Sequence, residues 1–219
     1  MSELIPIEAC LLDGEVVAVA PRLLNLVLVH GDRAGRIVEV EAYGGSEDPA
    51  SHAFRGRRTR HATMFGRAGL CYVYFTYGMH HCANVVCGPV GRAAAVLVRA
   101  VEPVAGVDAW RDGRPARVSD ERLGAGPARL CRSLAITAAL DGADLLDPAS
   151  PLRLMGDGRA APSRPLRGER IGLSVRAGSA RAWRWRFAVP GSPAISVPIR
   201  PGPSTPPILD RKVRPRYAR

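Results

Sequence analysis

The chain has 219 residues, 47% of them hydrophobic, and it carries 31 Lys and Arg against 20 Asp and Glu, a formal net charge of +11. This length and composition predict one globular domain with a full core, and no apolar run approaches the roughly 18 residues of a membrane span. A net positive field attracts polyanions and favours a nucleic-acid partner, although a coding bias toward arginine is an alternative explanation of the charge.

The N-terminal segment and the cysteines indicate the compartment. An acid at Glu3 and the lack of a basic region before the first apolar residues argue against a secretory signal, so we expect a cytoplasmic location, on the nucleoid if the host is bacterial. The five cysteines form no C-x-x-C pair and predict no structural zinc site. Reduced, mostly buried thiols are expected there.

The first half of the chain predicts a helix and then short strands. The helix covers 15–24, a strand covers 26–30, and a turn at 31–32 leads into a strand at 35–43. The following segment, 44–69, is polar, rich in arginine and without periodicity. A loop of that length inside a compact domain is usually functional or disordered.

The second half predicts a hairpin with strands at 70–77 and up to residue 87, a further strand at 93–101, and a helix that begins at Pro127, a favoured first helical position. Late strands are predicted at 171–176 and 183–189. Because successive strands join through short turns, we expect an α+β domain at 1–200 with a mostly antiparallel, curved sheet surrounded by helices. The basic, proline-rich tail at 201–219 is expected to be extended or mobile.

Two acids interrupt the apolar strand RIVEVEAY, at Glu39 and Glu41. The alternation of a strand puts them on one face with Ile37 and Tyr43, while the residues between them face the core. A carboxylate that lines a cleft is partly desolvated, which raises its pKa toward the range of a general base. A solvent-facing strand with two acids is the alternative.

The run YVYFTYGM holds three tyrosines, of which Tyr72 and Tyr74 share one face of their strand. Tyr77 precedes Gly78, where the chain must turn, so its ring can project from the hairpin tip. Phenol rings in a groove stack on bases, and a cationic base adds about 0.5–2 kcal/mol of cation–π energy. Core packing is favoured for Tyr72, whereas packing and stacking both stay open for Tyr74 and Tyr77.

The polar loop after these acids carries His52 and the basic run RGRRTR. A lone histidine is usually a surface or structural residue. The basic run predicts phosphate contacts, although a solvated basic loop explains it nearly as well; its arginines are Arg55, Arg57, Arg58 and Arg60.

In combination, several motifs resemble those of the alkyladenine (3-methyladenine) DNA glycosylases, monofunctional base-excision repair enzymes for alkylated and deaminated purines. The resemblance spans roughly 22–196 and does not cover the tail. The matching stretches are RIVEVEAYGGSEDPASHAFRG, MFGRAGLCYVYFTYGMHHCANVVC, VLVRAVEP, GPARLCRSLAI, RIGLSVR and FAVPGSPAIS.

The resemblance implies roles for single residues. Glu41 is similar to the catalytic acid that deprotonates water and aims it at C1′ of a flipped nucleotide, and Arg99 to a residue near the sugar-phosphate and that water. The base pocket is implied to consist of Tyr43 and Tyr74, which stack on the base, His52, which hydrogen-bonds it, and Asn84, which clashes with the amine of normal guanine. Tyr77 matches the wedge that enters the minor groove.

The implied partner is double-stranded DNA that contains 3-methyladenine, 7-methylguanine, hypoxanthine or ethenoadenine, bound without metal or other cofactor. We expect a monomer, because a monomer fits a protein that must scan a duplex. Schiff-base chemistry needs an amine, and the only lysine, Lys212, is in the tail. We therefore expect no lyase activity and an abasic product. The chain departs from the family pattern at Asn25, His61, His80 and His81.

Two other classes of protein stay open. A non-catalytic protein that binds damaged DNA would have the same charge and tyrosines but no use for Glu41. A metal-dependent hydrolase would use Glu39, Glu41, Asp48 and His52, although their spacing matches no recognisable set of metal ligands.

Overall fold

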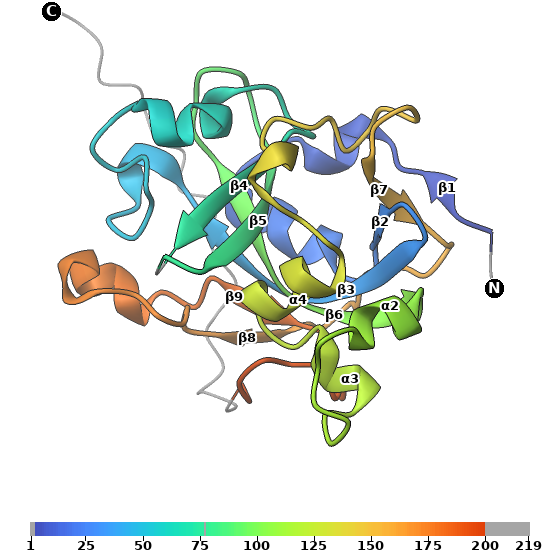
Figure 1. Ribbon diagram of the computed structural model, residues 1–219. Coiled ribbons are helices and arrows are strands. Elements are labelled where there is room, and N and C mark those ends of the chain that lie inside the picture. The colour runs from blue at the N-terminus through green and yellow to red at the C-terminus, as the bar shows by residue number, and fades with distance from the viewer. Residues whose placement is uncertain (1–2, 77, 200–219) are drawn as a thin grey trace, which may run out of the picture.

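An antiparallel, curved sheet organises the computed structural model, which describes residues 3–76 and 78–199 (Figure 1). Helices pack around this sheet in a single domain, so the predicted α+β fold is confirmed. The predicted tail at 201–219 and the predicted wedge, Tyr77, lie outside the described residues, and the domain boundary at residue 200 stays a prediction. In the described ranges, none of the helices is long and apolar enough to cross a membrane.

The strand order is β1-β7-β2-β3-β6-β5-β4, with β9 on β3 and β8 on β9. The central strand β3 pairs with β6 along one edge, and with β2 and then β9 along the other. The strands are β1 (Ile5–Pro6), β2 (Val27–His30), β3 (Arg33–Tyr43), β4 (Cys71–Thr76), β5 (His80–Val86), β6 (Ala95–Ala105), β7 (Leu152–Gly156), β8 (Leu166–Gly168) and β9 (Arg186–Ala188).

The helices are short, and their apolar side chains join β3 and β6 in the largest core cluster, with Leu23, Trp110 and Leu130 fully or almost fully buried. The α-helices are α1 (Val16–Val19), α2 (Val107–Arg111), α3 (Asp120–Leu123) and α4 (Pro127–Ser133). The 3₁₀ helices are η1 (Ala9–Leu12), η2 (Ala20–Leu23), η3 (Gly45–Glu47), η4 (Thr59–Phe65), η5 (Ala138–Leu140) and η6 (Val175–Ala182).

The predicted helix at 15–24 is α1 continued by η2, because Pro21 has no N–H to extend the α-helical ladder. Asn25 follows with a φ of 72°. Asparagine tolerates this left-handed conformation better than most residues, so the position does not require a glycine.

The predicted strand at 171–176 is wrong. Gly172 has a φ of +74°, outside the range of a strand, and η6 begins at Val175. The late strand predicted at 183–189 contracts to β9, and the predicted loop at 44–69 contains η3 and η4.

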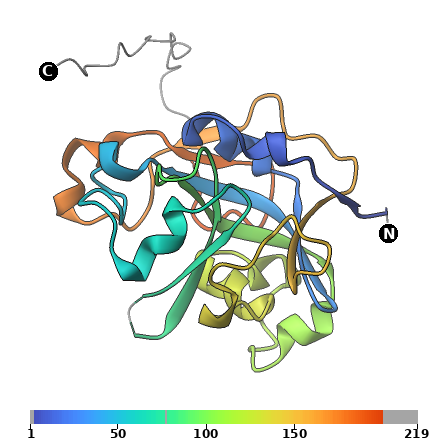
Figure 2. The ribbon, with the colours of Figure 1, turned by 90° about the horizontal axis from the view of Figure 1, so that it is seen from above.

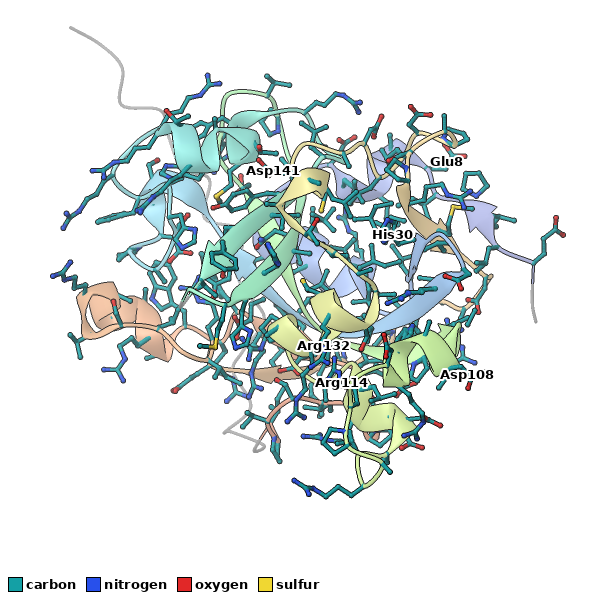
Figure 3. All side chains as sticks on the ribbon, viewed as in Figure 1. Glu8, His30, Asp108, Arg114, Arg132 and Asp141 are labelled. Atoms are coloured by element: carbon teal, nitrogen blue, oxygen red, sulfur yellow. The ribbon has the colours of Figure 1, made fainter. Side chains whose placement is uncertain are left out.

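The β4–β5 hairpin projects from the domain (Figure 2). Asp141, labelled in Figure 3, fixes its base. Its carboxylate accepts a hydrogen bond from the Val73 amide at 2.9 Å and from the Thr63 hydroxyl at 3.0 Å. The hairpin is thus tied to both η4 and the turn after η5.

Candidate active site

A bulge in β3 orients both acids of the RIVEVEAY motif away from the main core. The register with β6 shifts on either side of Glu39, which resets the alternation of side chains. As a result Ile37 packs in the main core with Val40 and Ala42, and its predicted place beside the acids is wrong. Glu39 and Glu41 share a face as predicted, and both are 0% exposed, so the solvent-facing alternative is wrong.

Glu41 is held by three hydrogen bonds. Its Oε1 accepts from the Ile171 amide at 2.7 Å, and its Oε2 accepts from the Tyr43 hydroxyl at 2.9 Å and from Arg99 Nη1 at 3.2 Å. A carboxylate has about four acceptor positions. Among the described residues three are used, which leaves one position on Oε1 for a water.

Burial raises the pKa of Glu41, against the opposing effects of the Arg99 charge and of the hydrogen bonds from Ile171 and Tyr43. A raised pKa makes the carboxylate a stronger base once it is ionised. The basic form is present above this pKa and is lost as the pH falls through it.

Glu39 contacts groups from three other parts of the chain. Its carboxylate accepts from Arg186 Nη1 on β9 at 2.8 Å and from the Ser196 amide at 2.6 Å. Arg99 Nε on β6 lies 3.4 Å from Oε1, an ion-pair contact without the alignment of a hydrogen bond. Arg99 therefore faces both acids.

A cavity of about 420 Å³, within the usual range for a small-molecule site, lies beside Glu41, although Glu41 itself is not among the residues that line it. The three hydrogen-bond partners of Glu41 all line it. The structure brings together the predicted pocket residues Tyr43, His52, Tyr74, Asn84 and Arg99 on its walls. The sequence did not indicate further lining by Cys82, Pro127, Leu173 and Ala177.

His52 and two tyrosines form one wall of the cavity. The His52 ring lies edge-on to Tyr74, with centroids 4.6 Å apart, and its Nδ1 is 3.0 Å from the Tyr72 hydroxyl. Partial burial lowers the pKa of His52, and the charges of Arg60 and His61 lower it further. At neutral pH the ring is therefore uncharged and can both donate and accept a hydrogen bond. Tyr72 packs as predicted but also holds His52.

Asn84 lies on the next strand and is 4% exposed. Its Nδ2 donates to the backbone oxygen of Tyr72 at 3.0 Å. This bond fixes the orientation of the carboxamide, so Asn84 forms a rigid part of the cavity wall.

Arg170 is a structural residue that the sequence did not single out. Its guanidinium makes a bidentate ion pair with Asp48 at 2.5 and 2.8 Å, with both side chains 0% exposed. The same group lies 4.8 Å from the ring centroid of Tyr43 and also contacts Trp183 and Trp185. It therefore supports a wall of the cavity from behind.

The ligand set of the predicted metal alternative is not assembled. Asp48 is bound to Arg170, while Glu39 and Glu41 are bound to Arg186 and Arg99. Within residues 3–76 and 78–199, no group of three His, Cys, Asp or Glu side chains could hold a metal ion.

The basic loop, residues 55–60, carries the predicted phosphate contacts. Arg55, Arg57, Arg58 and Arg60 are all exposed. In the part of the chain that the structure describes, none of them makes an ion pair. Arg57 lies over the Phe65 ring at 5.8 Å. The loop presents uncompensated positive charge next to the cavity, whose wall includes His52.

Comparisons with known proteins show which family the chain is similar to. A family model described as "Methylpurine-DNA glycosylase (MPG)" matches residues 11–193. A protein of Burkholderia lata is 50% identical over 188 residues, 85% of this chain and 89% of its own. Proteins of Frankia casuarinae and Streptomyces avermitilis are 48% and 46% identical, over 86% and 83% of this chain and 91% and 86% of their own lengths. All three are named "Putative 3-methyladenine DNA glycosylase".

Proposed function

The chain belongs to the methylpurine-DNA glycosylase family, and from this premise we propose that it is a monofunctional DNA glycosylase of base-excision repair. It flips alkylated or deaminated purines out of duplex DNA and hydrolyses the N-glycosidic bond. The observation that supports this proposal is a fully buried carboxylate, Glu41, whose hydrogen-bond partners Tyr43, Arg99 and Ile171 line the cavity. Among the described residues one acceptor position of Glu41 stays unused and can take a water.

In the proposed reaction Glu41 binds a water at Oε1 and takes its proton. The hydroxide oxygen bonds to C1′ of the flipped nucleotide while the bond from C1′ to N9 breaks and its electron pair leaves with the purine. Positive charge develops on the sugar, and the Glu41 carboxylate stabilises it. Ring-alkylated purines are already cationic, so they leave as neutral bases, whereas the uncharged hypoxanthine and ethenoadenine leave as anions that take a proton from solvent. Arg99, next to Glu41, orients the carboxylate and lies near the sugar-phosphate.

The cavity is proposed to bind the extruded base. An enzyme that acts on a base must take it out of the duplex, at a cost of about a few kcal/mol that is smallest for damaged pairs. Tyr43 and Tyr74 stack on the two faces of the base, His52 hydrogen-bonds its edge, and Asn84 excludes the exocyclic amine of normal guanine. The uncharged state of His52 supports this role, because a cationic ring would repel a cationic lesion.

The remaining proposed contacts are with the duplex. Tyr77, which the sequence places between β4 and β5, fills the space of the extruded base, and an inserted side chain of this kind offsets part of the unstacking cost. The basic loop binds phosphates. The proposed lesions are 3-methyladenine, 7-methylguanine, hypoxanthine and ethenoadenine, and the proposed product is an abasic site.

The test is base release from duplexes that each carry one such lesion, assayed in EDTA and developed with alkali. We expect abasic sites from at least one lesion and no strand cleavage before alkali. Borohydride should trap no covalent complex, because no amine is proposed to act. Lesion binding without release would favour the non-catalytic alternative, and release that EDTA abolishes would favour the metal-dependent one.

A further inference from the structure

Glu39 is a buried carboxylate that the proposed reaction does not use. Like Glu41 it is 0% exposed and does not line the cavity, but its hydrogen-bond partners, Arg186 and Ser196, do not line the cavity either. Removing a carboxylate from water is unfavourable unless it is well paired, and Glu39 is paired on two sides, by Arg186 at 2.8 Å and by Arg99 at 3.4 Å. Because one of these arginines, Arg99, also binds Glu41, Glu39 can act on the site through Arg99.

The charged groups form a row in which signs alternate: Arg186, Glu39, Arg99 and Glu41. The row contains two carboxylates and two guanidiniums, so it is neutral when all four groups are ionised. Arg99 is shared, since its Nε faces Glu39 and its Nη1 donates to Glu41. Changing the charge at Glu39 or Arg186 therefore changes how strongly Arg99 binds Glu41.

We propose that Glu39 is a positioning residue for the hydrolytic reaction, a proposal that rests on the function proposed above. Glu39 attracts the Nε edge of the Arg99 guanidinium, which orients Nη1 toward Glu41. Because Arg99 then interacts with both carboxylates, its charge stabilises the ionised form of Glu41 less strongly. Arg186 balances Glu39 from the other side. Through Arg99 the two residues set the basicity of Glu41 without touching the substrate.

The direction of the effect follows from the charges around Glu41. Glu39 raises the pKa of Glu41 and Arg99 lowers it. Without the charge of Glu39, Arg99 turns wholly to Glu41 and the pKa of Glu41 falls. Without Arg186, Glu39 draws Arg99 away and that pKa rises. The titratable and charged groups that face Glu41 are Glu39 and Tyr43 on β3, Tyr74 on β4, Cys82 on β5 and Arg99 on β6.

The experiment measures single-turnover excision against pH for the wild type, Glu39→Gln, Arg186→Gln and the double variant. A duplex with one 7-methylguanine is the substrate, because its fixed charge removes the need to protonate the leaving base. The acid limb of the pH–rate profile, where the rate falls as Glu41 is protonated, reports the pKa of Glu41. We expect this limb to move about one pH unit down for Glu39→Gln and about one pH unit up for Arg186→Gln. The acid limb of the double variant, whose cluster stays neutral, should lie between those of the two single variants. The protein concentration that gives half of the maximal rate should be unchanged in all three.

A merely structural role lowers the plateau rate of a variant without moving the limb, and circular dichroism at each pH identifies any unfolding. If Glu39→Gln does not fold, the neutral double variant and Arg186→Gln still give the order of the limbs. Coincident limbs, or shifts of the same sign, overturn the assignment of Glu39 while the proposed function stands. Failure of the wild type to release any base overturns both.

Discussion

Two sets of arginines in this protein differ in burial and in pairing with acids. Arg99, Arg170 and Arg186 are buried, and each binds a buried carboxylate. The arginines of the basic loop are exposed and, within the ranges described, are in no ion pair. The 31 Lys and Arg residues thus include two kinds of positive charge: some balances buried acids and adds nothing to the net charge of +11, and some is free to meet a polyanion. A coding bias can explain the number of arginines but not this division.

The largest effect should come from the buried set. Glu41→Gln removes the proposed base while the amide oxygen can still accept from the Ile171 amide, so the single-turnover rate of base release should fall by roughly 10²–10⁴-fold. Binding of the lesion duplex should persist. Glu47→Gln is the control, because the Glu47 side chain is 81% exposed in η3, the helix that follows β3. A Glu41→Gln rate close to that of the wild type would mean that another group is the base.

Stability should also distinguish buried from exposed charges. Asp48→Asn leaves the Arg170 charge buried without its partner, so the free energy of unfolding in urea should fall by about 3–5 kcal/mol. Glu15→Gln breaks an ion pair with Arg92 in which both side chains are more than half exposed and should cost about 0–1 kcal/mol. Equal losses would show that burial of the Asp48 pair does not determine its contribution.

The stacking role of Tyr74 should appear as a smaller change in affinity. In a Glu41→Gln background, which prevents turnover, Tyr74→Leu should weaken binding of the lesion duplex by the roughly 1–3 kcal/mol that one stacked base contributes. Tyr74→Phe keeps the ring and is the matched control, with affinity retained. If both variants bind equally weakly, the hydroxyl rather than the ring carries the effect.

The smallest effect per residue is expected in the basic loop. Each arginine that contacts a phosphate should contribute about 0.9 to the slope of log affinity against log salt. Changing Arg55, Arg57, Arg58 and Arg60 to Gln should therefore flatten the slope and leave the excision rate at saturation unchanged. Arg159→Gln is the control, since this exposed residue follows β7, near the opposite end of the sheet from β4. A slope that does not change would show that the loop is solvated rather than bound.

The sequence predicted the central strands because alternation and turn residues mark them clearly, from β2 to β6. It missed α2, α3, β7 and β8, which have three to five residues each, too few to show a period. It also predicted a strand at 171–176, where apolar residues alternate with others but a left-handed glycine prevents extension.

The sequence alone predicted part of the site. Strand alternation predicted that Glu39 and Glu41 share a face, but not the bulge that returns Ile37 to the core. Only the family resemblance selected Glu41, Tyr43, His52, Tyr74, Asn84 and Arg99 as one pocket. The partners Arg170, Arg186 and Ser196 are more than 120 residues from the acids that they bind, and a single sequence does not separate Arg170 and Arg186 from the chain's other arginines.

The most direct test of this division measures two quantities on the same lesion duplex, the salt dependence of binding and the single-turnover rate of base release. The variants are Glu41→Gln and the fourfold Gln variant of the basic loop. We predict that Glu41→Gln lowers the rate of base release and leaves the slope of log affinity against log salt unchanged. The loop variant should leave the rate unchanged and reduce that slope. A Glu41→Gln variant that releases the base at the wild-type rate, or a loop variant that abolishes release at saturating protein, would contradict this division of roles.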